Sequence, residues 1–213
     1  MSANELILIG GGGHCRAAID VIRTQGVHTI LGILDQPARI GERMLNVECI
    51  GGDENIPHYV QRGSHFLVTV GQVGLSTLRK ELYEKVMRAG GMPGTIISPK
   101  AHIADEATLG PGTLVGHFAL VNSGTRVGAN AIINSGAIVE HDCSIDDHVH
   151  VATGAVVNGD CIVGSGSFIG SGAVIRQGIR IGERCVVGAG AVVLKDVMDG
   201  ATVVGVPATR RAR

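Results

Sequence analysis

Hydrophobic residues recur every six positions along the C-terminal half of the chain. Read in sixes from Ile103, sixteen consecutive blocks begin with Ile, Leu or Val, among them LGPGTL, VEHDCS and VGAGAV. The fifth position of a block is usually Ala, Thr, Ser or Cys, and the third and fourth are often Gly, Asp, Asn, Ser or His. This period predicts short parallel strands separated by turns, with the first and fifth residues inward and the third and fourth in the turn.

Three such blocks close one triangular coil of about 18 residues, and coils stack at the inter-strand spacing of about 4.8 Å. The repeat therefore predicts a prism on the order of 25 Å tall, with no loop interrupting its flat faces. We place this β-helix domain at residues 98–200, followed by a C-terminal tail at 201–213.

Residues 1–97 show a different pattern, in which apolar runs alternate with helical segments. The predicted order is strand, helix, strand, strand and helix, at residues 5–9, 14–24, 29–34, 65–70 and 76–89. This order predicts a small Rossmann-like α/β domain. The expected fold class is thus an α/β N-terminal Rossmann-like domain followed by a parallel β-helix.

A glycine loop joins the first predicted strand to the first helix. Gly10 and Gly12 match the first two glycines of GxGxxG, but Cys15 stands at the third position. Such loops bind phosphate through free backbone N–H groups and the helix dipole, and Asp35 lies at the spacing of an acidic residue that holds a ribose. These features indicate a nucleotide site. The alternative is a tight strand-to-helix turn without a ligand.

Composition and charge narrow the possible functions. A net charge of −1 without a long basic run gives no electrostatic reason to expect nucleic acid or a membrane surface as partner. The apolar run near the N-terminus is too short for a signal peptide or a membrane span, so we expect a cytoplasmic protein. The five cysteines form no CxxC pair and are expected to be reduced and mostly buried.

One stretch, GAIVEHDCSIDDHVHV at residues 136–151, concentrates titratable groups. In the six-residue frame His141 and Asp142 fall at a corner of the prism, with their side chains outward. Cys143 falls at the buried fifth position, and Cys161, 18 residues later, should stack on it. His150 ends its block and should point out from a flat face. The remaining corner residues are expected to be solvated: Asp146, Asp147 and His148.

His141 is the candidate general base. An amine that attacks a thioester must lose a proton, and a histidine with a pKa of about 6.5 is largely neutral and able to accept it. A neighbouring carboxylate can orient the ring and stabilise its charged form, and both Asp142 and Glu140 are candidates for this role. Because Cys143 should point inward, we expect no covalent cysteine intermediate.

A zinc site is the alternative interpretation of the same stretch. The gamma-class carbonic anhydrases carry three zinc-binding histidines on a prism of this kind, two of them five residues apart. Here the separations among His141, His148 and His150 are seven, nine and two. We therefore expect no metal.

The order strand, GGGGH, helix, Asp and hexapeptide prism resembles the bacterial sialic acid O-acetyltransferase and bacillosamine N-acetyltransferase family, and most of all its perosamine N-acetyltransferase branch. The resemblance implies a left-handed β-helix and a homotrimer with acetyl-CoA, the co-substrate, between two prisms. It implies an acetyl-CoA-dependent N-acetyltransferase acting on a nucleotide-linked 4-amino-4,6-dideoxy sugar, preferably GDP-perosamine, in O-antigen lipopolysaccharide synthesis.

The resemblance also implies roles for individual residues. His141 would be the base and Asp142 its acidic partner. The residues assigned to the substrate are Gly12, Gly13, His14, Asp35 and Asn134. The residues assigned to acetyl-CoA are His150, Gly159, Val206 and Pro207, with Arg210 or Arg211 either at a phosphate or in a basic end.

Other functions remain open from the sequence. The same base could serve O-acetylation of a sialic acid, and the acceptor could be a UDP-linked amino sugar. A metal-dependent hydratase and a non-catalytic nucleotide-sugar-binding protein are the two alternatives from other classes.

Overall fold

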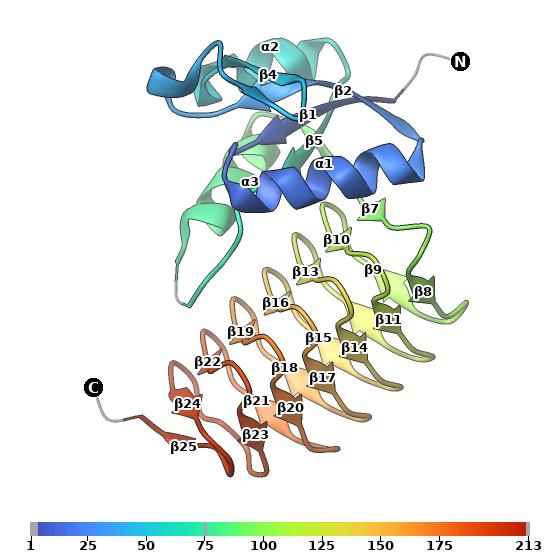
Figure 1. Ribbon diagram of the computed structural model, residues 1–213, viewed down its shortest axis with the longest axis vertical. Coiled ribbons are helices and arrows are strands. Elements are labelled where there is room, and N and C mark those ends of the chain that lie inside the picture. Colours follow the sequence, from blue (N-terminus) through green and yellow to red (C-terminus); the bar gives the residue numbers. More distant parts are fainter. Residues whose placement is uncertain (1–3, 75, 212–213) are drawn as a thin grey trace.

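The computed structural model describes residues 4–74 and 76–211. It consists of a small α/β domain that lies over the first coils of a long parallel β-helix and reaches along face 1 to the middle coils (Figure 1). The predicted order of a Rossmann-like domain and a β-helix is confirmed. The chain runs from the α/β domain directly into the first coil, so that the last coil lies farthest from it (Figure 1).

The α/β domain contains a six-stranded sheet in the order β3-β4-β2-β1-β5-β6. Its strands are β1 Asn4–Ile9, β2 His28–Leu34, β3 Arg43–Met44, β4 Val47–Gly51, β5 His65–Val68 and β6 Met92–Pro93. Its helices are α1 Gly13–Gln25, α2 Ile56–Gln61 and α3 Leu78–Arg88, with 3-10 turns η1 Pro37–Arg39 and η2 Asp53–Asn55. The five predicted elements are present to within two residues, and β3, β4, β6 and α2 were not predicted.

The β-helix has three faces built from short strands. Face 1 contains β7 Ile96–Ile97, β10 Leu114–Val115, β13 Ile132–Ile133, β16 His150–Val151, β19 Phe168–Ile169, β22 Val186–Val187, β24 Thr202–Val204 and β25 Thr209–Arg210. Face 2 contains β8 His102–Ile103, β11 Leu120–Val121, β14 Ile138–Val139, β17 Val156–Val157, β20 Val174–Ile175 and β23 Val192–Val193. Face 3 contains β9 Thr108–Leu109, β12 Arg126–Val127, β15 Ser144–Ile145, β18 Ile162–Val163 and β21 Arg180–Ile181.

The corners of the prism explain the composition of the fourth block position. Asn130, Asp142, His148 and Asp160 occupy it with φ of 53°, 60°, 61° and 59°, and glycines occupy it in several other coils. This left-handed backbone conformation is easiest for Gly, Asn and Asp. Phe118 and Arg184 adopt the same conformation at this position, with φ of 60° and 48°, so the turn requires this backbone whatever its side chain.

Hydroxyl and thiol groups at the fifth position line the inside of the corners. Thr125 Oγ1, Cys143 Sγ and Cys161 Sγ each donate to a backbone carbonyl 15 residues later, at 2.6, 3.2 and 3.2 Å. These buried donors are thereby satisfied. Cys143 and Cys161 occupy the same corner of successive coils, and all five cysteines are free and buried, which confirms the predicted use of cysteine.

The six-residue period ends before the sixteenth block is complete. Ile181 pairs with Val197, 16 residues later, whereas pairs in the earlier coils lie 18 apart, such as Val139 with Val157. The prediction of sixteen uninterrupted blocks was therefore wrong in its last block. Residues 202–210 form β24 and β25 on face 1, where a tail was expected.

Arg79 joins the two domains from within. Its side chain is 1 % exposed, and its Nε donates to the carbonyl of Asn130 in the β-helix at 3.1 Å. Its Nη1 donates to the carbonyl of Val68, the last residue of β5, at 2.5 Å and to that of Val70, two residues later, at 3.0 Å. Burial lowers the pKa of Arg79 to about 9, so it stays charged at neutral pH and fixes α3 to the prism.

Candidate active site

His141 and Asp142 form a hydrogen-bonded pair at an open corner of the prism. They lie in the turn between β14 on face 2 and β15 on face 3, and their side chains are 52 % and 69 % exposed. His141 Nδ1 lies 2.9 Å from Asp142 Oδ2. Because a carboxylate can only accept, Nδ1 carries the proton and Nε2 keeps a free lone pair. This is the tautomer that a general base acting through Nε2 requires.

The surroundings of His141 favour its charged form. The hydrogen bond with Asp142 raises the pKa of His141 above its ordinary value, and the charges of Glu140 and Asp160 act in the same direction. Glu140 makes no such bond to the ring, because its Oε2 accepts from Asn122 Nδ2 at 2.8 Å. Of the two candidate carboxylates, Asp142 thus orients the ring, and Glu140 acts only through its charge.

Gly159 lies one coil beyond His141 at the same corner. A Cβ built on Gly159 would lie 2.6 Å from both Cε1 and Nε2 of the His141 ring. No real side chain fits at that distance, so the bare backbone of Gly159 is what allows the ring to occupy its position.

If His141 is the base, a Gly159→Ala variant should lower kcat about 10-fold, because its methyl group displaces Nε2, the atom expected to accept the proton. The φ of Gly159 is not in the left-handed range, so the folded backbone accepts alanine. Steady-state kinetics with circular dichroism and CoA affinity as controls would test this. A normal kcat would mean that the position of Nε2 is unimportant.

Three other residues singled out in the sequence meet where the α/β domain covers face 1. His150 Nδ1 donates to the carbonyl of Gln72 at 2.7 Å, and its Nε2 lies 3.3 Å from Asn134 Nδ2. The ring of His14, in the first turn of α1, has its centroid 6.2 Å from that of His150. His150 does point out from its face, but the α/β domain covers it and leaves it 6 % exposed.

The two histidines at this junction are held neutral. Burial, together with the nearby positive charge of Arg79, lowers the pKa of His150 to about 4 and that of His14 to about 3. Both rings are therefore uncharged at neutral pH, whereas the pKa of His141 is raised. They can donate or accept single hydrogen bonds there but do not supply positive charge.

His148 was expected to be a solvated corner residue, and this prediction was wrong. Its side chain is 9 % exposed, its Nδ1 lies 3.0 Å from Asn130 Nδ2, and its ring packs edge-on against Tyr83 at 5.6 Å. The corner between faces 3 and 1 is the one that α3 covers, and the repeat alone does not say which corner is covered. Asp146 and Asp147 are exposed as expected.

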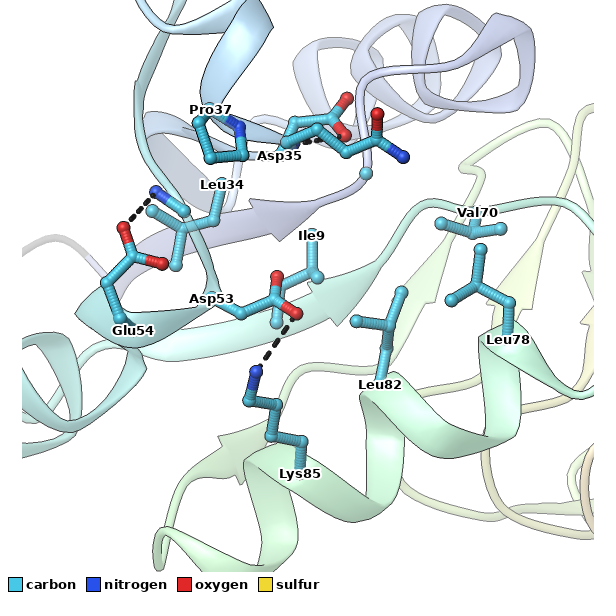
Figure 2. A pocket seen from close by; sticks show the side chains of 13 residues that line it. Ile9, Leu34, Asp35, Pro37, Asp53, Glu54, Val70, Leu78, Leu82 and Lys85 are labelled. Carbon is cyan, nitrogen blue, oxygen red and sulfur yellow. Dashed lines mark hydrogen bonds and ion pairs between the residues drawn. The ribbon is translucent and has the colours of Figure 1, made fainter.

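The glycine loop borders a pocket of about 360 Å³ at the carboxyl ends of β1 and β2 (Figure 2). Open α/β sheets bind ligands at this edge. Its apolar walls come from separate elements: Ile9, Leu34, Pro37, Val70, Leu78 and Leu82. Its polar side chains stand at the ends: Asp35, Gln36, Asp53, Glu54 and Lys85.

Gly12 and Gly13 leave the space at the start of α1 open. No atom lies within 4 Å of a Cβ built on either glycine. The first backbone N–H groups of a helix have no intrahelical partner and attract anions. The geometry is therefore suited to a diphosphate, and the contacts assigned to these glycines stay a prediction.

The carboxylate of Asp35 is engaged by its own chain. It accepts from Gly11 N and Gln36 N, both at 2.7 Å, and from Arg39 Nη1 at 3.0 Å. Arg39 Nη1 also donates to the carbonyl of Gly11 at 2.7 Å. Asp35 thus fixes the glycine loop as well as lining the pocket. Arg39 is not among the sequence-predicted site residues, although it places a positive charge beside this loop.

Val206 and Pro207 lie in the turn between β24 and β25. The flanking Gly205 carbonyl accepts from Val192 N at 3.1 Å, and Ala208 N donates to the Val192 carbonyl at 2.8 Å. This holds the turn against the end of face 2 and leaves Val206 72 % exposed. The assigned contact of this turn with coenzyme A stays a prediction.

In a three-sided prism the corner between faces 2 and 3 lies opposite face 1. His141 and Asp142 are therefore on the far side of the prism from His14, Asn134 and His150 of the same chain. Within one chain, the predicted site residues therefore form two separate groups on opposite sides of the prism.

Neither a metal-binding cluster nor a membrane-spanning helix is found in the part of the chain that the structure describes. Within residues 4–74 and 76–211, no group of three or more His, Cys, Asp or Glu side chains is arranged to hold a metal ion. Over the same ranges, the helices are too short or too polar to cross a membrane.

A hexapeptide prism with a histidine–carboxylate pair on its edge, joined to an α/β domain with a glycine loop, defines a transferase of the hexapeptide-repeat class. Residues 5–86 match the family described as PglD N-terminal domain, and residues 160–195 match bacterial transferase hexapeptide (six repeats). Among curated proteins, no sequence matches the chain.

Several solved structures resemble this chain over nearly its whole length. The acetyltransferase domain of PglB from Neisseria gonorrhoeae, in complex with acetyl coenzyme A, is 30 % identical with a TM-score of 0.90, over 99 % of this chain and 100 % of that one. A variant of perosamine N-acetyltransferase from Caulobacter crescentus, in complex with CoA and GDP-perosamine, is 31 % identical with a TM-score of 0.91, over 98 % and 97 %. WeeI from Acinetobacter baumannii is 28 % identical with a TM-score of 0.82, over 97 % and 99 %.

The chain belongs to the hexapeptide-repeat sugar acetyltransferase family. It is an acyltransferase, and its β-helix is left-handed. The family and fold expected from the sequence are thereby confirmed.

Proposed function

We propose that this protein transfers the acetyl group of acetyl-CoA to the amino group of a nucleotide-linked 4-amino-4,6-dideoxy sugar, with GDP-perosamine as the preferred acceptor. The observation that carries the proposal is the exposed His141–Asp142 pair, with Nε2 of His141 free to accept a proton. The similar structures support the substrates, because their complexes contain acetyl coenzyme A in one case and CoA with GDP-perosamine in another.

The reaction is a direct transfer. The sugar amine attacks the thioester carbonyl while Nε2 of His141 accepts the proton that the amine loses. Asp142 stabilises the imidazolium that forms, and the backbone N–H of Gly159 donates to the developing oxyanion. The C–S bond then breaks, an amide remains on the sugar, and coenzyme A leaves as a thiolate. Cys143 is buried, and its thiol donates a hydrogen bond to a backbone carbonyl, which supports a route without an acyl-cysteine.

The complete site forms between chains of a homotrimer. A row of aliphatic side chains faces outward along face 2, whereas the corresponding row of face 3 is largely polar. The face 2 row consists of Leu120, Ile138, Val156, Val174 and Val192. Packing this row against a neighbouring copy would bring that copy beside the corner that carries His141, and would supply the groups that His141 cannot reach in its own chain.

The pH dependence should report the His141–Asp142 pair. The base works only when neutral, so kcat/KM rises as pH increases through the raised pKa of His141. Asp142→Asn removes the hydrogen bond and the charge that raise this pKa, so the acidic limb should move to lower pH. The plateau should fall about 10-fold because the ring loses its orienting partner.

A pH–rate profile of the variant checks this expectation, with Glu140→Gln as the matched control. Glu140 acts on the ring only through its charge, so this control should shift the limb less and keep the plateau. An acidic limb that stays in place in Asp142→Asn would show that the pair does not set the titration.

The proposal as a whole is tested by incubating the protein with acetyl-CoA and GDP- or UDP-linked amino sugars, and with a sialic acid. Amide formation on an amino sugar, followed by mass spectrometry, is the expected result. Acetylation of the sialic acid hydroxyl alone would replace the N-acetyltransferase by the O-acetyltransferase. If the protein binds the nucleotide but transfers acetyl to none of the acceptors, the result would support a nucleotide-sugar-binding protein instead.

A further inference from the structure

An ion pair closes one end of the pocket beside the glycine loop. Lys85 Nζ lies 3.1 Å from Asp53 Oδ2, with side chains 48 % and 32 % exposed. Asp53 comes from η2, directly after β4, and Lys85 comes from α3. Figure 2 shows the pair beside Ile9 and Leu82, so that a donor and an acceptor stand next to each other at the pocket edge.

The walls of this pocket suit a flat heteroaromatic ring. Leu34 and Pro37 lie on one side of it, and Leu78 and Leu82 lie on the other (Figure 2). Apolar side chains of this kind stack on a base, while polar groups at the end of the slot read its Watson–Crick edge. The glycine loop and Asp35 stand at the other end of the pocket, where the ribose and diphosphate would lie.

We propose that Asp53 and Lys85 determine the nucleobase of the acceptor, and that this base is guanine. The inference rests on the proposed function, in which this pocket holds the nucleotide of the sugar substrate. The Watson–Crick edge of guanine presents one acceptor, O6, followed by two donors, N1–H and N2–H. The ammonium of Lys85 can donate to O6, and the two carboxylate oxygens of Asp53 can accept from the two donors, as in a bidentate pair.

Other bases fit this pair less well. Uracil has one donor, N3–H, between two carbonyl oxygens, so one oxygen of Asp53 would face O2 of the base without a proton between them. Adenine and cytosine place an unprotonated ring nitrogen where guanine has N1–H. A lost bidentate contact to a base changes affinity by roughly 10-fold to 100-fold.

Glu54 positions the acceptor of the pair. Its Oε1 accepts from Gly52 N at 3.2 Å, and Asn55 Oδ1 accepts from the same N–H at 3.1 Å. These bonds fix the η2 turn that carries Asp53. Glu54 also adds a second negative charge at this end of the pocket, which further disfavours the carbonyl-rich edge of uracil.

Calorimetric titration of the full-length protein with GDP, IDP and UDP tests the assignment. GDP should bind about 10-fold or more tighter than UDP, and IDP, which lacks the N2 amine, should fall between them. Asp53→Asn replaces one acceptor by a donor, so GDP binding should weaken about 10-fold while UDP binding holds or improves. Lys85→Met should also weaken GDP. Lys80→Met, on the same helix but outside this pocket, should leave all three affinities unchanged.

Equal affinities for GDP and UDP, or a GDP-to-UDP ratio that Asp53→Asn leaves unchanged, would overturn the assignment. Acetyl transfer measured in parallel separates this result from failure of the proposed function. If a UDP-linked amino sugar is the better acceptor in a His141-dependent reaction, the function stands and the guanine assignment falls. If GDP binds selectively through Asp53 but no amino sugar is acetylated, the assignment stands and the function falls.

Discussion

Replacing His141 with Asn should lower kcat for acetyl transfer by about 10²-fold or more. Asparagine fits the same corner and can still face Asp142, but it has no group that accepts a proton at neutral pH. The amine would then have to release its proton to water as it attacks. The KM values for acetyl-CoA and the sugar should change little, because the imidazole acts mainly in the transition state.

The rate of thiol release from acetyl-CoA measures this effect, and mass spectrometry of the sugar confirms the product. His58→Asn is the matched control, because His58 is an exposed histidine on α2, away from the corner and from the pocket. A His141→Asn variant with a near-normal kcat and a normal circular dichroism spectrum would remove His141 from the mechanism.

Placing a charge on the aliphatic row of face 2 should separate the subunits and abolish most of the activity. In Val156→Glu the new carboxylate would lie in the middle of the proposed contact, where it would lose water without gaining a partner. Because His141 and the groups on face 1 of the same chain lie on opposite sides of the prism, a lone subunit holds half a site. We expect a monomer in sedimentation velocity and a loss of about 10²-fold in kcat/KM.

Thr108→Glu is the matched control for this variant. Thr108 faces outward from face 3, is exposed, and belongs to the polar row, so the same charge there should leave both assembly and activity intact. Nucleotide binding to the α/β domain should survive in both variants. A Val156→Glu protein that remains trimeric, or one that is monomeric and fully active, would contradict the proposed arrangement.

The period of six was sufficient to predict the β-helix because it depends on local rules. Inward residues must be apolar, and the turn residue must tolerate a positive φ. Both requirements are therefore visible within the 18 residues of each coil. The same frame placed His141 at an exposed corner, inward Cys143 beside it, and Gly159 one coil away. Of the two candidate carboxylates, the sequence could not choose, since that depends on Asn122 holding Glu140.

The two wrong predictions concern positions where segments distant in sequence meet. His148 occupies the same kind of corner position as Asp142, yet α3 covers one and leaves the other in solvent. The last block fails because β24 closes the prism with a shorter coil. Neither outcome is contained in the local pattern, because the cause lies in another part of the chain.

By itself, the sequence determined the prism, the α/β domain and the edge that carries His141, since each follows from the spacing of neighbouring residues. Only the tertiary structure decided which corner the α/β domain covers and which residues line the pocket beside the glycine loop. Asp35, Asp53 and Lys85 come from three separate segments with no common spacing, so no periodicity could group them. They meet because the carboxyl ends of parallel strands converge at one edge of a sheet, and α3 folds back across that edge.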